Sequence, residues 1–307
     1  MKRRWVLGLV LLAAAAVATV WAQQRDWSQE KITAEQVRGN IWMLVGAGGN
    51  IGVSVGPDGI LIVDDKFLPL ADKIRAALAE RGPGKLKFIL NTHWHGDHTG
   101  ANPVFGPEAL IIAQTNVRER LKTGNRAKKI EPLPKEGWPV ITFDQSLSVH
   151  FNGEEIKVIH FPHGHTDGDS VIFFTGSNVV HMGDDFFAGH FPYVDLDSGG
   201  DVEGLINNVA AIIGQLPADV KIIPGHGPLS TKEDVKKFTD MLHDCIGLVQ
   251  AAMKKKMSLE QMKKVNVLTK YDALGKGFVN TNDFIELIYN ELKGDITKTK
   301  QKSTKHH

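Results

Sequence analysis

The chain has 307 residues, of which 42% are hydrophobic, enough to bury a sizeable core. Its 36 Lys and Arg residues balance 35 Asp and Glu residues, so no net charge favours nucleic acid or an anionic membrane surface as a partner. We therefore expect a globular protein whose partner is a small-molecule substrate.

The N-terminal segment has the three parts of a secretory signal peptide. Residues 2–4 (KRR) are basic, residues 5–20 are apolar, and residues 20–22 (VWA) fit the small-residue cleavage signal. A membrane anchor needs about 20 apolar residues, more than this run contains. We expect residues 1–22 to be removed and the mature protein to be periplasmic or secreted, with no membrane association after cleavage.

From residue 41 to residue 180 the sequence predicts mostly short strands separated by turns. Strands are expected at residues 41–45, 51–55, 60–63, 86–90, 109–113, 148–151, 156–160, 170–175 and 178–181, and a later one at 220–223. The turn signal GPDG at 56–59 predicts a hairpin. Helical periodicity is present at residues 70–81, 202–216 and 232–256. Strands interleaved with helices favour a layered α/β or α+β domain.

The remaining segments define the domain organisation. Residues 122–139 carry three prolines, two glycines and five basic residues, which predicts a long surface loop. We expect a signal peptide over 1–22, a single domain with a C-terminal helical extension over 23–294, and a flexible tail over 295–307. Cys245 is the one cysteine, which excludes an intrachain disulfide and a multi-cysteine zinc site, and we expect a buried, unreactive thiol.

The stretch NTHWHGDHTG at residues 91–100 places four metal-ligand side chains within six positions, directly after a predicted strand. His93 and His95 lie two residues apart, so in an extended segment both imidazoles point the same way and can hold one ion. Gly96 allows a sharp turn in the loop, after which Asp97 and His98 point to a second position. A solvated polar loop is the alternative, but four such side chains together argue for a site for two metals.

Three later turns follow the same pattern, in which an apolar run is followed by glycine and by ligand-type residues. They are FPHGHT at 161–166, MGDD at 182–185 and PGHG at 224–227. Layered sheets gather ligands at the carboxyl ends of their strands. We therefore expect these turns to lie beside the first motif.

Taken in order, THWHGDH, GHT, MGDD and PGHG resemble the metal-binding motifs of the metallo-β-lactamase fold superfamily, over roughly residues 35–230. The resemblance implies an α+β fold, an αββα sandwich with a dinuclear site at the edge of its sheets. It implies that one metal is held by His93, His95 and His165, that the second is held by Asp97, His98 and His226, and that Asp184 bridges them. His165 is preferred to His163 because it directly precedes Thr166. Asp64 or Asp65 resembles an aspartate that orients a ligating histidine.

The same resemblance implies two zinc ions, with iron or manganese as alternatives for these nitrogen and oxygen ligands. Metal binding lowers the pKa of a bound water to about 7, and Asp97 would act as the catalytic residue that orients the resulting hydroxide. We expect hydrolysis of a small cyclic amide or ester, most of all a β-lactam. A lactonase or a glyoxalase II-type thioesterase is the alternative. A mononuclear iron enzyme similar to persulfide dioxygenases, or a binding protein without chemistry, would be of another class.

The segment after Asp184 supplies candidates for the substrate pocket. Phe187 stands three residues beyond the bridge, where related β-lactamases place a lysine and lactonases often a tyrosine, so neither anchor is present. Phe187, His190 and Tyr193 either form a pocket wall with polar donors or belong to a packed loop. Residues 194–200, with two glycines and two aspartates, are expected to be mobile.

Overall fold

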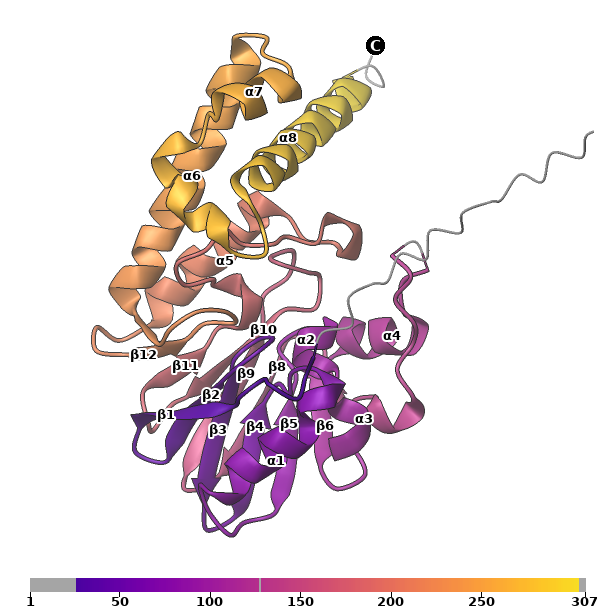
Figure 1. Cartoon of the computed structure of the whole chain (residues 1–307), viewed down its shortest axis with the longest axis vertical. Helices are drawn as coiled ribbons and strands as arrows, with labels where there is room; N and C mark the ends of the chain where they lie inside the picture. Colours follow the sequence, from indigo (N-terminus) through magenta and orange to yellow (C-terminus); the bar gives the residue numbers. More distant parts are fainter. Residues whose placement is uncertain (1–25, 127, 304–307) are drawn as a thin grey trace, which may run out of the picture.

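The computed structural model describes residues 26–126 and 128–303, with side chains up to residue 294. The predicted signal peptide lies outside the described residues, as do residues 304–307 of the predicted tail. Two β-sheets face each other and helices cover their outer faces, as the αββα prediction requires (Figure 1). The fold class expected from the sequence is confirmed.

Within the described residues, seven strands form the first sheet, in chain order. They are β1 (Thr33–Arg38), β2 (Ile41–Val45), β3 (Ile51–Gly56), β4 (Gly59–Val63), β5 (Leu86–Leu90), β6 (Leu110–Gln114) and β7 (Ile141–Phe143). β1 to β4 pair antiparallel and β4 to β7 pair parallel. The predicted hairpin is confirmed, because Gly56 pairs with Gly59 across the turn between β3 and β4. The parallel strands place the chain after β4 and after β5 at one edge of the sheet.

The second sheet has the order β13-β12-β11-β10-β9-β8. Its strands are β8 (Ser146–Phe151), β9 (Glu154–His160), β10 (Ser170–Phe174), β11 (Val179–His181), β12 (Lys221–Ile223) and β13 (Ser230–Thr231). β11 and β12 are parallel, so the MGDD and PGHG turns that follow them emerge side by side.

Helices pack on the outside of both sheets. They are α1 (Ala71–Ala79), α2 (Gly96–Thr99), α3 (Asn102–Phe105), α4 (Thr115–Thr123), α5 (Val202–Gln215), α6 (Lys232–Lys254), α7 (Leu259–Val265) and α8 (Thr281–Ser303). Ile74 of α1 packs in one apolar cluster with the first sheet, and α5, α6 and α8 share another with the second sheet. A third cluster, with Ile41 and Ile172, fills the space between the sheets. The helices predicted at 70–81, 202–216 and 232–256 correspond to α1, α5 and α6.

Other regions agree with the sequence in part. Residues 122–139 contain the end of α4 and a short 3-10 helix at Lys135–Gly137, and most of their side chains are in contact with solvent. α8 continues through residues 295–303, part of the segment for which the sequence predicts a flexible tail. Cys245 is fully buried in α6, and burial raises the pKa of its thiol to about 12. Such a thiol is unreactive at neutral pH.

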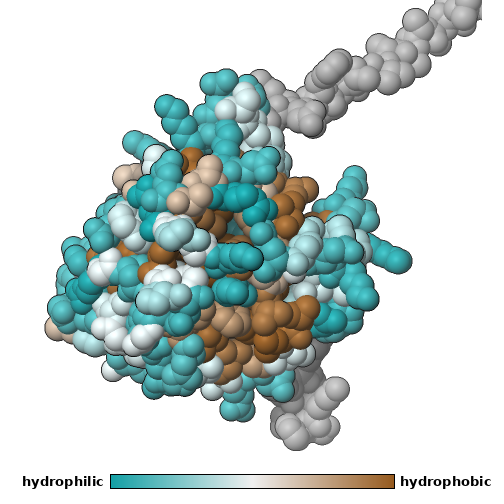
Figure 2. Space-filling model, turned by 90° about the horizontal axis from the view of Figure 1, so that it is seen from below, coloured by the Kyte–Doolittle hydropathy of each residue, from teal (hydrophilic) through white to brown (hydrophobic). Residues whose placement is uncertain are grey.

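The surface is mixed in character. Figure 2 shows hydrophobic side chains gathered among polar ones on the face seen from below the view of Figure 1. Large apolar side chains with substantial exposure include Val140, Val265 and, most of all, Phe278, which is 88% exposed. No helix within the described residues combines the length and the apolar character that a membrane span needs.

Candidate metal centre

The second half of the first histidine motif is a single helical turn. In α2 the N–H groups of His98 and Thr99 both donate to the carbonyl of His95, each at 3.0 Å. The sequence predicts a loop in which Gly96 allows a sharp turn, whereas residues 96–99 form a short helix, because consecutive hydrogen bonds to one carbonyl close the turn. The result is the same, since the helical turn directs Asp97 and His98 to a second position.

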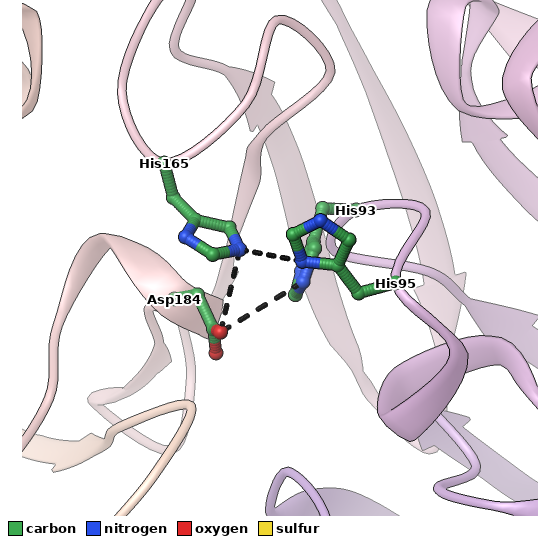
Figure 3. Close-up of side chains that lie close together, drawn as sticks. All are labelled: His93, His95, His165 and Asp184. Atoms are coloured by element: carbon green, nitrogen blue, oxygen red, sulfur yellow. Dashed lines mark hydrogen bonds and ion pairs between the residues drawn. The ribbon is translucent and has the colours of Figure 1, made fainter. Parts of the chain in front are cut away.

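Four side chains from both sheets form the first candidate ligand group (Figure 3): His93, His95, His165 and Asp184. One ligand atom from each lies within 4.8 Å of all the others. His165 Nε2 is 2.8 Å from His95 Nδ1 and 3.4 Å from Asp184 Oδ2, and His93 Nε2 is 3.8 Å from Asp184 Oδ2. Ligand atoms about 2 Å from a tetrahedral zinc ion lie roughly 3.3 Å apart. The group therefore has the dimensions of a single ion site.

The second group consists of Asp97, His98 and His226. His226 Nε2 is 3.3 Å from Asp97 Oδ2 and 3.4 Å from His98 Nε2. Asp184 also reaches this group, with Oδ1 3.2 Å from His98 Nε2 and Oδ2 3.5 Å from His226 Nε2. The structure thus brings together all seven residues that the resemblance implies as ligands, with Asp184 between the two groups.

Two atoms of the cluster are left without a conventional partner. His93 Nε2 and Asp184 Oδ1 are buried and make no hydrogen bond of good geometry among the described residues, although Asp184 Oδ1 lies 3.2 Å from His98 Nε2. Buried polar atoms are nearly always hydrogen-bonded, so two unsatisfied atoms in one cluster need an explanation. Cations in the two groups, one bound by His93 Nε2 and the other by Asp184 Oδ1, would supply it, and the imidazole and carboxylate donor set fits zinc.

The electrostatics of the cluster also fit a cation. Burial lowers the pKa of His93 well below its ordinary value and that of His165 to about 4, so both imidazoles are neutral and have a free lone pair. Burial opposes charge on Asp184, but His226 and the other histidines hold the pKa of its carboxyl well below its usual range. Burial likewise opposes charge on His226, but Asp184 raises its pKa to about 9. A divalent cation would displace such a proton and take its place beside the carboxylate.

Of the two aspartates, Asp64 is the one that contacts a candidate ligand histidine. His98 Nδ1 donates to Asp64 Oδ2 at 2.7 Å, and this contact leaves Nε2 free to face the cluster. Thr92 donates to the same carboxylate from both its N–H, at 2.8 Å, and its hydroxyl, at 2.7 Å. Asp65 instead accepts from the N–H of Ala101 at 3.0 Å.

The turn that carries Asp64 is fully buried and has an uncommon backbone. Asp64 has φ 65° and Lys66 has φ 60°, both in the left-handed region that favours glycine. The N–H of Asp65 donates to the carbonyl of His98 at 2.8 Å, and Lys66 Nζ donates to the carbonyl of Gly49. A Cβ at Gly49 would lie 2.1 Å from His98 Cε1, so glycine is required at this contact. The turn therefore contacts His98 through Asp64 and Asp65 and, through Lys66, binds the Gly49 backbone that packs on the His98 ring.

The third motif supplies His165 to the cluster and leaves His163 outside it. His165 is fully buried, with Nδ1 2.7 Å from the carbonyl of Tyr193 and Nε2 in the first group. His163 is exposed, and its Nδ1 is 3.1 Å from the carbonyl of Gly199. The preference for His165 agrees with this arrangement.

Asp195 contributes to the site, and the sequence analysis missed it. It is 1% exposed, its Oδ2 accepts from His95 Nε2 at 3.0 Å, and its Oδ1 accepts from Lys128 Nζ. Burial opposes its charge, but these donors hold the pKa of its carboxyl below its usual range. The contact leaves His95 Nδ1 free to face the cluster. The sequence predicts that residues 194–200 are mobile, and in the structure the Asp195 N–H donates to the carbonyl of His165 at 2.9 Å.

We expect Asp195→Asn to weaken zinc binding roughly 10- to 100-fold, the usual effect of removing a partner that orients a ligand. An asparagine must present its NH2 group to either His95 or Lys128, so one of the two contacts becomes donor to donor. Competition with a chromophoric chelator measures the affinity. Asp197→Asn is the matched control, because Asp197 Oδ2 also pairs with Lys128, at 3.4 Å, and is mostly exposed. Equal affinities in the two variants would contradict the role given to Asp195.

A cavity of about 600 Å³ opens above the metal cluster. His95, Asp97, His165, Asp184 and His226 line its floor, and its walls include all three pocket candidates, Phe187, His190 and Tyr193. Phe187 is 7% exposed and stacks on the His226 ring, with centroids 5.1 Å apart. The segment is therefore both a packed loop and a wall of the cavity.

Comparisons with known proteins agree with this geometry. The family model of the metallo-beta-lactamase superfamily matches residues 36–226. The 2,4-dinitroanisole O-demethylase subunit alpha of Nocardioides sp. is 28% identical over 167 residues, 53% of this chain and 49% of that protein. A hydroxyacylglutathione hydrolase of Nitrosococcus oceani is 32% identical over 163 residues, 52% of this chain and 55% of that protein. The chain thus matches about half the length of these two relatives.

A solved structure shows the same fold. The crystal structure of DIM-1 metallo-beta-lactamase superposes with a TM-score of 0.57, covering 70% of this chain and 98% of that one, at 18% identity. An identity this low speaks for the fold alone. The family model, however, spans more than half of the sequence and includes all seven candidate ligands. The chain belongs to the metallo-beta-lactamase superfamily.

Proposed function

We propose that the protein is a dinuclear, zinc-dependent hydrolase that cleaves the acyl bond of a small ester, lactone or thioester. The observation that carries the proposal is the position of Asp184, whose two oxygens lie within 3.8 Å of nitrogens from four histidines, two in each group. A carboxylate shared in this way suits two ions better than one. The relative named hydroxyacylglutathione hydrolase supports acyl-bond hydrolysis.

Bound zinc would supply a nucleophilic hydroxide at neutral pH and an electrophile for the carbonyl oxygen. The residues of this chain position the reactants around it. Asp97 faces the cavity, and although burial opposes its charge, the nearby His98 and the hydrogen bond from His226 lower its pKa to about 2. Its carboxylate is therefore ionised at neutral pH, as an acceptor that orients a water proton must be.

A β-lactam is the second candidate substrate, favoured by the predicted export of the protein to the compartment where such antibiotics act. The carboxylate of a β-lactam would find no unpaired Lys or Arg among the described residues that line the cavity. Phe187 occupies the position of the usual lysine, and Lys128, the one Lys or Arg among the described residues that line the cavity, pairs with Asp195 and Asp197. We therefore expect β-lactam hydrolysis with a high KM and modest kcat.

Steady-state assays of the zinc-loaded protein on four substrates test this ranking: a glutathione thioester, an acyl-homoserine lactone, a penicillin and a carbapenem. We expect kcat/KM to be highest for the thioester or the lactone. Efficient turnover of a lactam, with little of either acyl substrate, would reverse the ranking. Metal analysis separates the hydrolase from an oxidoreductase with a single iron, because two zinc ions per chain are expected instead of one iron.

We also propose that the protein is exported. The proposal rests on the basic, apolar and small-residue parts of residues 1–22, which match a cleavable signal peptide. We expect intact-mass measurement of the purified protein to give a chain that begins at Gln23, recovered from the periplasm or the medium. A cell-associated product that retains residues 1–22 would contradict this.

A further inference from the structure

We infer that Phe278 is a specificity-determining residue that selects substrates with an apolar substituent long enough to reach it from the scissile bond. The inference rests on the proposed hydrolytic function of the same cavity. Phe278 lies in the C-terminal extension, between the 3-10 helix at Thr269–Lys276 and α8, more than 50 residues beyond the last candidate ligand, His226. Phe278 is therefore not part of any of the four metal motifs.

The extension is fixed to the cavity wall by several contacts. The N–H of Phe191 donates to the carbonyl of Leu274 at 3.3 Å, and the rings of Phe191 and Phe284 stack with centroids 4.4 Å apart. Gly277 packs so closely on His190 that a Cβ there would lie 2.6 Å from the imidazole ring. These contacts place Phe278 at the cavity as part of the packed structure.

Phe278 itself leaves most of its ring uncovered. It lines the metal-site cavity yet is 88% exposed, and its one ring contact among the described residues is an edge contact with Tyr193, at 5.9 Å between centroids. Contact with an apolar group would remove much of this ring from water, which favours binding of such a group.

The distribution of polarity within the cavity agrees with this. The floor carries the ligand carboxylates and imidazoles, whereas Phe67, Ile130 and Phe278 contribute apolar surface to the lining. Lys128, which also lines the cavity, is neutralised by Asp195 and hydrogen-bonded to Tyr193 Oη at 3.1 Å. A substrate with a polar reacting bond and an uncharged apolar substituent matches this arrangement.

Calorimetric binding of alkyl hydroxamates to the zinc-loaded protein tests the inference without turnover. Acetohydroxamate, butyrohydroxamate and octanohydroxamate share one metal-binding head and differ in chain length. In the unmodified protein the affinity should rise by roughly two- to fourfold for each methylene that becomes buried. Phe278→Ala should lose most of this gradient and keep acetohydroxamate binding within about twofold, since that ligand is too short to gain much from apolar burial. Phe278→Leu should restore part of the gradient.

Val265→Ala is the matched control, because Val265 is an exposed apolar residue of the same extension, 60% exposed, that does not line the cavity. It should keep the full gradient. Equal gradients in the unmodified protein and in Phe278→Ala, or no gradient in either, would overturn the inference. Loss of the gradient in Phe278→Ala together with no turnover of any ester or thioester would refute the proposed hydrolysis and still support an apolar subsite at Phe278.

Discussion

Asp184→Ala is expected to disrupt both metal sites at once and to reduce kcat by at least roughly a hundred- to a thousandfold, the range seen when one preorganised electrostatic group is removed. The reason is its position, with carboxylate oxygens 3.4 Å from His165 Nε2 and 3.2 Å from His98 Nε2, in different groups. Without this carboxylate, both groups also lose the negative charge that favours binding of a cation beside the histidines. Elemental analysis of zinc per chain and steady-state kinetics measure the effect.

Paired variants of the third motif provide the control. His165→Ala should weaken the first ion, because Nε2 of this residue belongs to the first group, whereas His163→Ala should keep two zinc ions and normal turnover, because its side chain is exposed and faces Gly199. An Asp184→Ala protein with two tightly bound ions would contradict the bridging role. Metal loss in His163→Ala but not in His165→Ala would show that the third-motif assignment is wrong.

Metal removal is the second change with a large expected effect. Chelation should abolish turnover and lower Tm, because an ion present at a thousand times its Kd stabilises the folded state by about 4 kcal/mol. For a chain of this size that corresponds to roughly 7 °C. His93 and Asp97 follow β5 of the first sheet, whereas their group partners His165 and His226 follow β9 and β12 of the second sheet. Each group of candidate ligands therefore joins the two sheets. Thermal unfolding followed by circular dichroism, with and without chelator, measures the shift.

Zinc added back to the chelated protein should restore both turnover and Tm, which separates loss of the ion from irreversible damage. Magnesium at the same concentration is the control, because it prefers oxygen ligands and should restore neither. An unchanged Tm after complete removal of zinc would mean that the ions do not stabilise the packing of the two sheets.

Most of the sheet structure was predictable because its strands are buried and apolar. β4 is buried at every position, and a short apolar run between turn signals is a strong indication of such a strand. β1 was missed because four of its six residues are polar or charged and only Val37 is buried, so pairing with β2 stabilises it more than its own pattern indicates. α4 was missed for a similar reason, since only Val117 and Leu121 of its nine residues are buried.

The candidate site was predictable as far as its ligands are adjacent in sequence or repeat a pattern. His93, His95, Asp97 and His98 lie within one short motif, and each later ligand follows a strand and a glycine. Asp195 gave no such signal, because its partners His95 and Lys128 are 100 and 67 residues away. The choice between Asp64 and Asp65 depended on a left-handed backbone that the sequence pattern does not specify for aspartate.

The buried turn at residues 64–66 also affects the order in which the site forms. A left-handed conformation at a residue other than glycine costs on the order of 1–2 kcal/mol, so Asp64 and Lys66 adopt it only when the surrounding contacts are in place. Those contacts are hydrogen bonds with Thr92, His98 and Gly49, and none of them needs a metal ion in order to form. We therefore expect residues 64–66 and the residues that they contact to lose their conformational entropy when the polypeptide folds, without a bound ion. An incoming ion is then expected to meet a site whose His98 side is already ordered.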